Sequence, residues 1–137
     1  MKIRISKVKR WKVAVSNNSI ISIVDDDESV REAIESLIKS IGYRAEVFAS
    51  AEDFLNRSTQ HCSDCLILDV RMPGMNGLDL QRQLVANNCG IPVIFISAHG
   101  DEETRSLALK VGAIDFLLKP FSEEALLVAI QAALNSR

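Results

Sequence analysis

Polar side chains that could do chemistry stand directly after four short apolar runs of this sequence. In chain order they are Asp25 with Asp26, then Asp69, Ser97 and Lys119. Short apolar runs that end in this way are typical of buried parallel strands. The carboxyl ends of parallel strands lie along one edge of a sheet, where ligands and chemistry collect. The sequence therefore predicts that carboxylates, a hydroxyl and an ammonium group converge on one small surface.

This set of groups suits phosphoryl transfer. Clustered carboxylates repel one another unless a cation lies among them. Oxygen ligands of this kind suit Mg²⁺, which keeps several waters and takes one or two carboxylates. With a metal held by Asp26 and Asp69, the free oxygen of Asp69 can act as a nucleophile toward phosphorus. The metal and Lys119 would neutralise the oxygens of the transferring group, and Ser97 would donate a hydrogen bond to it.

Each of these residues has a plainer explanation when it is taken alone. Asp25 and Asp26 could belong to a helix N-terminus, and Asp69 could end a strand before the turn formed by residues 73–77. Ser97 could be an ordinary loop residue, and Lys119 a solvated charge. Packing does not require the strand ends along one edge all to become polar. The joint pattern therefore favours a site.

The elements that would position these groups alternate between strand and helix from Ser19 onward. Strands are predicted at 20–24, 44–48, 65–68, 92–96 and 115–118. Helices are predicted at 28–40, after Ser50, at 77–87, at 102–111 and after Ser122. Five strands that alternate with five helices predict an α/β fold with a doubly wound five-stranded parallel sheet.

Length and composition exclude several classes of protein. The chain has 137 residues, of which 47% are hydrophobic and 25% charged, the balance of one globular domain. No apolar run approaches the ~20 residues that a membrane span needs. The three cysteines form an odd set, and the N-terminus lacks the apolar segment of a secretory signal. We therefore expect a cytoplasmic protein without a disulfide framework and without membrane contact through a span.

The charges divide the chain into two parts. Residues 1–18 hold six basic residues and no acidic one, so residues 19–137 hold ten basic and 18 acidic residues, a net charge of −8. An acidic body is not typical of a nucleic-acid-binding domain. We expect residues 1–18 to be a flexible basic extension. An added edge strand, or an arm that contacts nucleic acid or membrane through Trp11, is the alternative.

Four stretches of the chain resemble a known family. IVDDDESVR, LILDVRMPGMNG, IFISAHGD and GAIDFLLKPF look like the signatures of the response-regulator receiver domain, the CheY-like fold, in the family's order and spacing over residues 19–135. The stretches ESVREAIESL, FASAEDFL and DVRMPGMNGLDLQ are similar to the FixJ/NarL type. The resemblance implies a flavodoxin-like (βα)5 receiver domain over residues 19–137.

The resemblance also implies a role for each residue of the site. Asp69 would be the phosphoacceptor, Lys119 the phosphate partner and Ser97 the switch hydroxyl. Phe116 would be the switch aromatic, and a cis peptide bond would join Lys119 to Pro120. The implied ligands of Mg²⁺ (or Mn²⁺) are Asp25, Asp26, Asp69 and the backbone carbonyl of Arg71.

The implied function is two-component signal transduction. A sensor histidine kinase would supply the phosphoryl group, and the domain would catalyse its own phosphorylation and dephosphorylation without being a turnover enzyme in the usual sense. The modified site would change the face formed by residues 97–121 and control dimerisation. DNA would be contacted only through an output domain that this chain does not contain. The alternative is a stand-alone receiver that acts through protein–protein interaction.

Other readings have less support. A phosphatase of the haloacid-dehalogenase type usually has a second Asp two residues after its nucleophile, where this chain has Arg71. A receiver-like module that is never phosphorylated typically lacks part of the acidic set or the Lys, and this chain has both. His61, Cys62 and Cys65 lack the further ligands that a zinc or redox site needs. His99 could tune phosphoryl hydrolysis or be an ordinary loop residue.

Overall fold

The computed structural model describes residues 19–57, 63–100 and 102–136. The strands are β1 (Ile20–Val24), β2 (Arg44–Phe48), β3 (Cys65–Asp69), β4 (Val93–Ser97) and β5 (Asp115–Leu118). The helices are α2 (Glu28–Ser40), α3 (Ala51–Arg57), α4 (Gly77–Ala86), α5 (Glu102–Lys110) and α6 (Glu123–Asn135). These elements match the predicted ones, and where both ends of an element were predicted, they differ from the observed ends by at most one residue. The predicted N-terminal extension, 1–18, lies outside the described residues.

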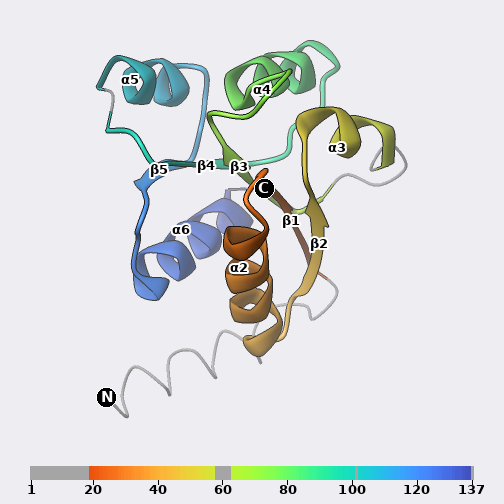
Figure 1. Ribbon diagram of the computed structural model, residues 1–137, viewed down its shortest axis with the longest axis vertical. Helices are drawn as coiled ribbons and strands as arrows, with labels where there is room; N and C mark the ends of the chain where they lie inside the picture. Colours follow the sequence, from red (N-terminus) through yellow and green to blue (C-terminus); the bar gives the residue numbers. More distant parts are fainter. Residues whose placement is uncertain (1–18, 58–62, 101, 137) are drawn as a thin grey trace.

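The strands form one parallel sheet in the order β2-β1-β3-β4-β5. Helices α2 and α6 cover one face of the sheet, and α3, α4 and α5 cover the other (Figure 1). The chain moves from β1 outward to β2 and then crosses back to place β3 on the other side of β1. This change of direction lies between β1 and β3, the position at which doubly wound sheets bind their ligands. The predicted fold class is confirmed.

The hydrophobic core has two layers, one on each face of the sheet, because successive side chains of a strand point to opposite faces. Ile21 and Ile23 of β1 pack toward α2 and α6, as does Ile67 of β3. Leu66 and Leu68 of β3 point the other way and pack toward α3, α4 and α5. Because side chains alternate across a strand, a fully apolar strand such as β3 must be covered on both faces. All five residues of β3 are buried, the last being Asp69.

Polar residues begin the helices at the edge of the sheet where the strands end. The Asp27 side chain accepts the Ser29 N–H before α2, and the Ser122 side chain accepts the Ala125 N–H before α6. The Ser50 hydroxyl accepts the Asp53 N–H before α3 at 3.0 Å. These caps satisfy amide groups that the first helical turn leaves without partners. The helices predicted to follow Ser50 and Ser122 thus begin directly after these residues.

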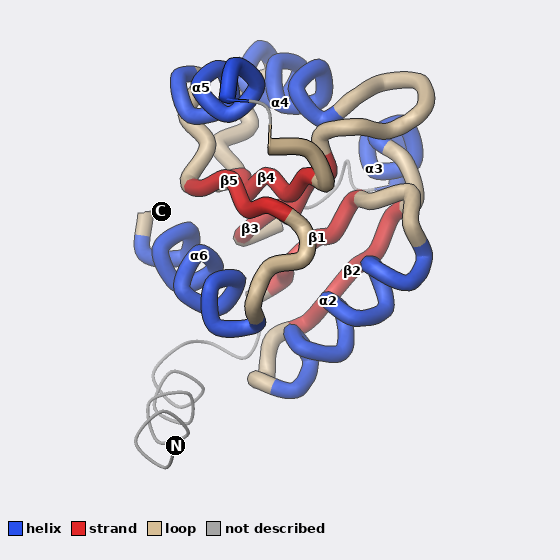
Figure 2. The backbone as a smooth tube through the Cα atoms, turned by 60° about the vertical axis from the view of Figure 1, so that its left-hand side comes forward, coloured by secondary structure: helices blue, strands red, loops and turns tan. Residues whose placement is uncertain are grey.

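The register of the strands brings the predicted site together. Val24 pairs with Leu68, so the residues that follow β1 lie beside the end of β3. Asp69 pairs with Ile96, and Ser97 pairs with Leu118. The ends of β1, β3, β4 and β5 therefore lie along one edge of the sheet, which Figure 2 shows from a second direction. In the described parts of the chain, no helix has the length and apolar character needed to cross a membrane.

Candidate functional site

Three carboxylates meet at the carboxyl edge of the sheet. One oxygen from each of Asp25, Asp26 and Asp69 lies within 4.8 Å of the others. Asp25 is fully buried and Asp69 is 4% exposed, whereas Asp26 faces solvent. Two of the three negative groups thus lie below the surface, and the third covers them from the solvent side. The convergence of these carboxylates predicted from the strand ends is confirmed.

Asp25 is held on both of its oxygens. Lys119 Nζ donates to Oδ2 at 2.9 Å, and the backbone N–H of Asp27 donates to Oδ1 at 2.8 Å. The backbone carbonyl of Asp25 accepts a bond of 2.7 Å from the Arg31 guanidinium of α2. A buried carboxylate is tolerated when its oxygens are paired in this way. These bonds fix the start of the loop that joins β1 to α2.

Asp69 has fewer compensating partners. Burial, together with the neighbouring charges of Asp25 and Asp26, raises the pKa of Asp69 to about 7. Lys119 Nζ lies 3.6 Å from Asp69 Oδ1 and acts in the opposite direction, but it does not offset the other effects. A carboxyl in such surroundings favours its neutral form unless a further cation joins the cluster. Hard oxygen donors at this spacing fit a divalent cation such as Mg²⁺.

Lys119 is the cation that the fold itself supplies. It follows β5, and its side chain is 20% exposed. Partial burial acts to lower the pKa of Lys119, but the hydrogen bond to Asp25 and the charges of Asp25 and Asp69 outweigh burial and raise it. Lys119 therefore stays an ammonium. The cis peptide bond predicted between Lys119 and Pro120 is present.

The loop after Asp69 is held close to the end of β3. The Gly77 N–H donates to the Val70 carbonyl at 2.9 Å, and the Asn76 side chain accepts the Asp79 N–H to begin α4. A Cβ added at Gly77 would lie 2.3 Å from the carbonyl oxygen of Asp69. No side chain fits there, so glycine is what lets α4 start against the strand end. The exposed Arg71 lies in this loop, two residues past Asp69.

Ser97 and Phe116 are buried and have partners other than Asp69. Ser97 is 1% exposed, and its hydroxyl accepts the His99 N–H at 3.1 Å and lies 3.2 Å from the His99 carbonyl. Phe116 is 3% exposed and packs against Phe95 with ring centroids 6.4 Å apart. The side chain of Arg105 donates to the Phe116 carbonyl at 3.2 Å. A cavity of about 180 Å³ lies beside this ring, lined by Gly100, Glu102, Arg105, Phe116 and Leu118.

The comparison with protein families shows the family of this chain. The family model of the response regulator receiver domain matches residues 21–131. The chain belongs to this family. It is the receiver domain of a two-component response regulator, as the four sequence stretches predicted.

Relatives and solved structures agree with this assignment. The response regulator protein TodT of Pseudomonas putida is 56% identical over 117 residues, covering 85% of this chain and 52% of TodT. The transcriptional regulatory protein FixJ of Azorhizobium caulinodans is 39% identical over 115 residues, covering 84% of this chain and 54% of FixJ. The chain thus spans about half the length of the curated relatives that it matches. The structure titled FixJ-N has a TM-score of 0.81 at 35% identity, covering 88% of this chain and 96% of that one.

Several contacts of this receiver domain were not predicted from its sequence. Arg31 reaches the Asp25 carbonyl, Arg105 reaches the Phe116 carbonyl, and Glu52 reaches the Met75 N–H. Each joins two elements through a backbone group, and no residue pattern marks such a partner. Glu52 is separated from Met75 by 23 residues. Glu52 lies in the first turn of α3, where an acidic residue is favourable in any case, so its type and position do not mark the contact.

The other residues that the sequence suggested for a metal or redox site do not form a second site within the described residues. Burial raises the pKa of the Cys65 thiol to about 12, so it is not a ready thiolate. His61 and Cys62 lie outside the described residues. The exposed His99 contacts Ser97 through its backbone, and an effect of its ring on phosphoryl hydrolysis stays a prediction.

Proposed function

We propose that Asp69 of this receiver domain accepts a phosphoryl group from a phosphohistidine of a sensor kinase, in the presence of Mg²⁺ or Mn²⁺. The observation that carries the proposal is the convergence of Asp25, Asp26, Asp69 and Lys119 on one edge of the sheet. Asp69 is the carboxylate that lacks the close backbone and ammonium bonds of Asp25, so an oxygen of its side chain is available to react.

The reaction moves one phosphoryl group between two side chains. An oxygen of the ionised Asp69 attacks phosphorus as the bond from phosphorus to the histidine nitrogen breaks. The electron pair of that bond stays on the nitrogen, and a proton already carried by the other ring nitrogen, or taken up from solvent, makes the leaving group a neutral imidazole. Asp69 then carries an acyl phosphate. Water attacking the same phosphorus later returns the free carboxylate and inorganic phosphate. The domain would thereby catalyse steps of its own modification and its removal.

The residues around Asp69 would keep it reactive and neutralise the added charge. Bound Mg²⁺, held by Asp25, Asp26, Asp69 and the Arg71 carbonyl, would offset the negative charge of the transferring oxygens. Lys119 lies 3.6 Å from Asp69 and favours the ionised carboxyl that attack requires. The ammonium group of Lys119 lies close to both Asp25 and Asp69. A small shift away from Asp25 would therefore bring it to the new phosphoryl oxygens.

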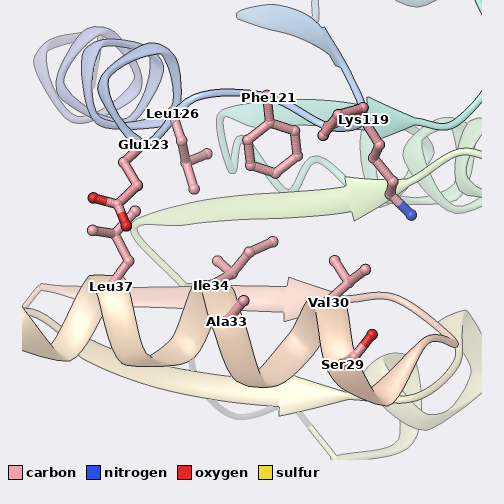
Figure 3. A pocket seen from close by; sticks show the side chains of 10 residues that line it. Ser29, Val30, Ala33, Ile34, Leu37, Lys119, Phe121, Glu123 and Leu126 are labelled. Carbon is pink, nitrogen blue, oxygen red and sulfur yellow. The ribbon is translucent and has the colours of Figure 1, made fainter.

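A groove beside the site suits the protein that carries the phosphohistidine. It has a volume of about 510 Å³ and lies between α2 and the segment from β5 to α6, with Lys119 among its lining residues. Val30 and Leu37 of α2 face Phe121 and Leu126 across it (Figure 3). An apolar groove that adjoins a reactive carboxylate suits a helical donor, which would bury its apolar face there and present its histidine to Asp69.

The signal would be read through Ser97 and Phe116. Phosphorylation adds roughly two negative charges and three acceptor oxygens. Ser97 would leave the His99 backbone and donate its hydroxyl proton to a phosphoryl oxygen. Phe116 already lies inward, and the cavity beside it offers an outward position. Phosphorylation would then shift the population of the ring toward the inward position.

Exposed apolar side chains lie on the elements that follow Ser97, around the face formed by residues 97–121 and α6. They are Leu107, Leu109, Val111, Leu118 and Val128, on or next to α5, β5 and α6, and each is at least 38% exposed. We propose that phosphorylation makes this face, within residues 97–121 and the adjoining α6, a homodimer interface. In a longer protein, pairing would control a DNA-binding output domain. A stand-alone receiver that acts through protein–protein contacts is the alternative.

Labelling with a small phosphodonor tests the proposal. The protein is incubated with radiolabelled acetyl phosphate, with Mg²⁺ or with EDTA. We expect labelling with Mg²⁺, and its loss in EDTA and in Asp69→Asn. Asp79→Asn is the matched control, because Asp79 is an exposed carboxylate of α4 outside the cluster, and it should label like the wild type. Labelling that survives Asp69→Asn would overturn the assignment.

Two further measurements separate the rival functions. Steady release of phosphate from a phosphomonoester would favour a phosphatase, whereas we expect at most one equivalent of phosphoprotein. Beryllofluoride with Mg²⁺ should convert the protein to a dimer in analytical ultracentrifugation. A protein that labels but stays monomeric would favour the stand-alone receiver.

A further inference from the structure

The loop between β3 and α4 carries a proposed metal ligand and is anchored unevenly. Its start is held by the Val70 N–H, which donates to the Ile96 carbonyl at 3.0 Å. Its end is held by the bond from the Gly77 N–H to the Val70 carbonyl. Between these anchors lie residues 71–76, of which Met72 is buried in the core and Pro73 and Gly74 at the tip are exposed. The exposed tip, which follows the Arg71 carbonyl in the chain, is held by a further contact.

That contact comes from α3. Glu52 Oε2 accepts the Met75 N–H at 2.9 Å, and this bond lowers the pKa of the Glu52 carboxyl. Gly74 has a φ of 77°, a backbone conformation that side chains disfavour. A Cβ added at Gly74 would lie 2.7 Å from the same Glu52 oxygen. The tip of the loop is therefore shaped, in both conformation and space, to receive this carboxylate.

We propose that Glu52 is a positioning residue for the divalent cation: by holding the Met75 N–H, it fixes the loop that presents the Arg71 carbonyl. The inference rests on the proposed function, because it concerns the metal of the same site. Glu52 does not touch the metal in this assignment. Its effect passes through the four peptide units that join Met75 to Arg71, whose torsions decide where the Arg71 carbonyl points.

The energetic reason is preorganisation. A loop that already holds its ligand in place spends less conformational entropy when the cation binds. Residues that orient a ligand without touching the metal typically change metal affinity by about 10-fold or more when they are removed. Because Glu52 is exposed, its substitution opens no cavity in the core. If Glu52 has the proposed role, its substitution should weaken Mg²⁺ binding and leave the free energy of unfolding unchanged.

Three substitutions distinguish positioning from simple attraction between charges. Glu52→Ala removes the acceptor, Glu52→Gln keeps an acceptor without the charge, and Glu52→Asp keeps the charge but is one methylene too short to reach. We expect the Kd for Mg²⁺ to rise about 3-fold in Glu52→Gln and about 10-fold in both Glu52→Asp and Glu52→Ala. The Kd is measured by titrating Mg²⁺ alone and following the heat of binding.

A measurement without metal tests the contact itself. In EDTA, hydrogen exchange of the Met75 amide should be faster in Glu52→Ala than in the wild type, while the unfolding midpoint stays the same. Asp53→Asn is the matched control. It removes a charge from the same turn of α3, where Asp53 pairs with Arg57 of its own helix, and it should leave both the exchange and the Kd unchanged.

The outcomes separate this inference from the proposed function. If Glu52→Asp binds Mg²⁺ like the wild type while Glu52→Gln is as weak as Glu52→Ala, charge alone accounts for the effect and the positioning role is wrong. Unchanged Met75 exchange in Glu52→Ala would also overturn it. If the wild type itself neither binds Mg²⁺ nor labels on Asp69, the proposed function fails, whatever the exchange of Met75 shows.

Discussion

The two edges of the sheet differ in how their carboxylates are paired. At the amino edge, Asp64 Oδ2 accepts the Ile20 N–H at 2.7 Å and so ties β1 to the segment before β3. At the carboxyl edge, Asp25 and Asp69 lie buried beside Asp26 with Lys119 as the adjoining ammonium. The carboxylate of the first edge completes the backbone bonding of the sheet. The second edge concentrates like charges that the protein does not balance by itself.

This difference teaches where the fold gives up stability for function. A buried like-charge cluster disfavours ionisation, and the raised pKa of Asp69 expresses that cost. The same imbalance suits the edge to a cation and, in the proposed function, to accepting a phosphoryl group. Substitutions matched between the two edges should therefore have different or opposite effects on stability.

The largest difference in stability between the two edges is expected when glycine is replaced by alanine. Gly77→Ala places a Cβ 2.3 Å from the Asp69 carbonyl oxygen, a clash with backbone that only movement of α4 can relieve. We expect the free energy of unfolding to fall by about 3 kcal/mol. Gly90, before β4 at the amino edge, is the control, because an added Cβ there meets no described atom within 4 Å. Urea unfolding in EDTA measures both, and equal losses would contradict the close approach.

The next largest effect is a gain in stability. Asp69→Asn in EDTA removes a buried charge from the cluster and should raise the free energy of unfolding by about 2 kcal/mol at pH 8. The pKa of Asp69 rises from 3.8 in the unfolded chain to about 7 in the fold. Folding therefore favours the protonated carboxyl, and this group destabilises the fold progressively as pH rises from about 4 to about 7.

The pH dependence gives the control for that prediction. In EDTA, wild-type stability should decline over this pH range more steeply than the stability of Asp69→Asn. Saturating Mg²⁺ should stabilise the wild type and leave the variant less affected, because a bound cation favours the ionised carboxyl. A variant that is less stable than the wild type in EDTA at pH 8 would show that Asp69 is satisfied in the fold.

The smallest effect is expected at the amino edge and has the opposite sign. Asp64→Ala removes the acceptor of the Ile20 N–H and should lower the free energy of unfolding by about 1 kcal/mol. Mg²⁺ should stabilise this variant as much as the wild type, since Asp64 lies away from the cluster. The measurement is the urea midpoint with and without Mg²⁺. If Asp64→Ala were more stable than the wild type, as expected for Asp69→Asn, the two edges of the sheet would not differ in this way.

The sequence by itself determined the fold class and the members of the site. Its apolar runs placed the strands, and the polar residue after each run marked the strand end, because periodicity and burial act locally along the chain. Asp25, Asp26, Asp69, Ser97 and Lys119 were all found in this way, and all lie at the carboxyl edge.

Only the tertiary structure decided how these residues share their partners. In the fold, Lys119 Nζ lies 2.9 Å from Asp25 and 3.6 Å from Asp69. The Ser97 hydroxyl accepts the His99 N–H, and the Phe116 side chain lies in the core. The fold also brings Glu52 of α3 to the loop that follows β3. Apart from the contact of Ser97 with His99, these contacts join elements far apart in the chain. The packing of helices on the sheet sets them, and no local pattern of residue types records which backbone group a distant side chain will reach.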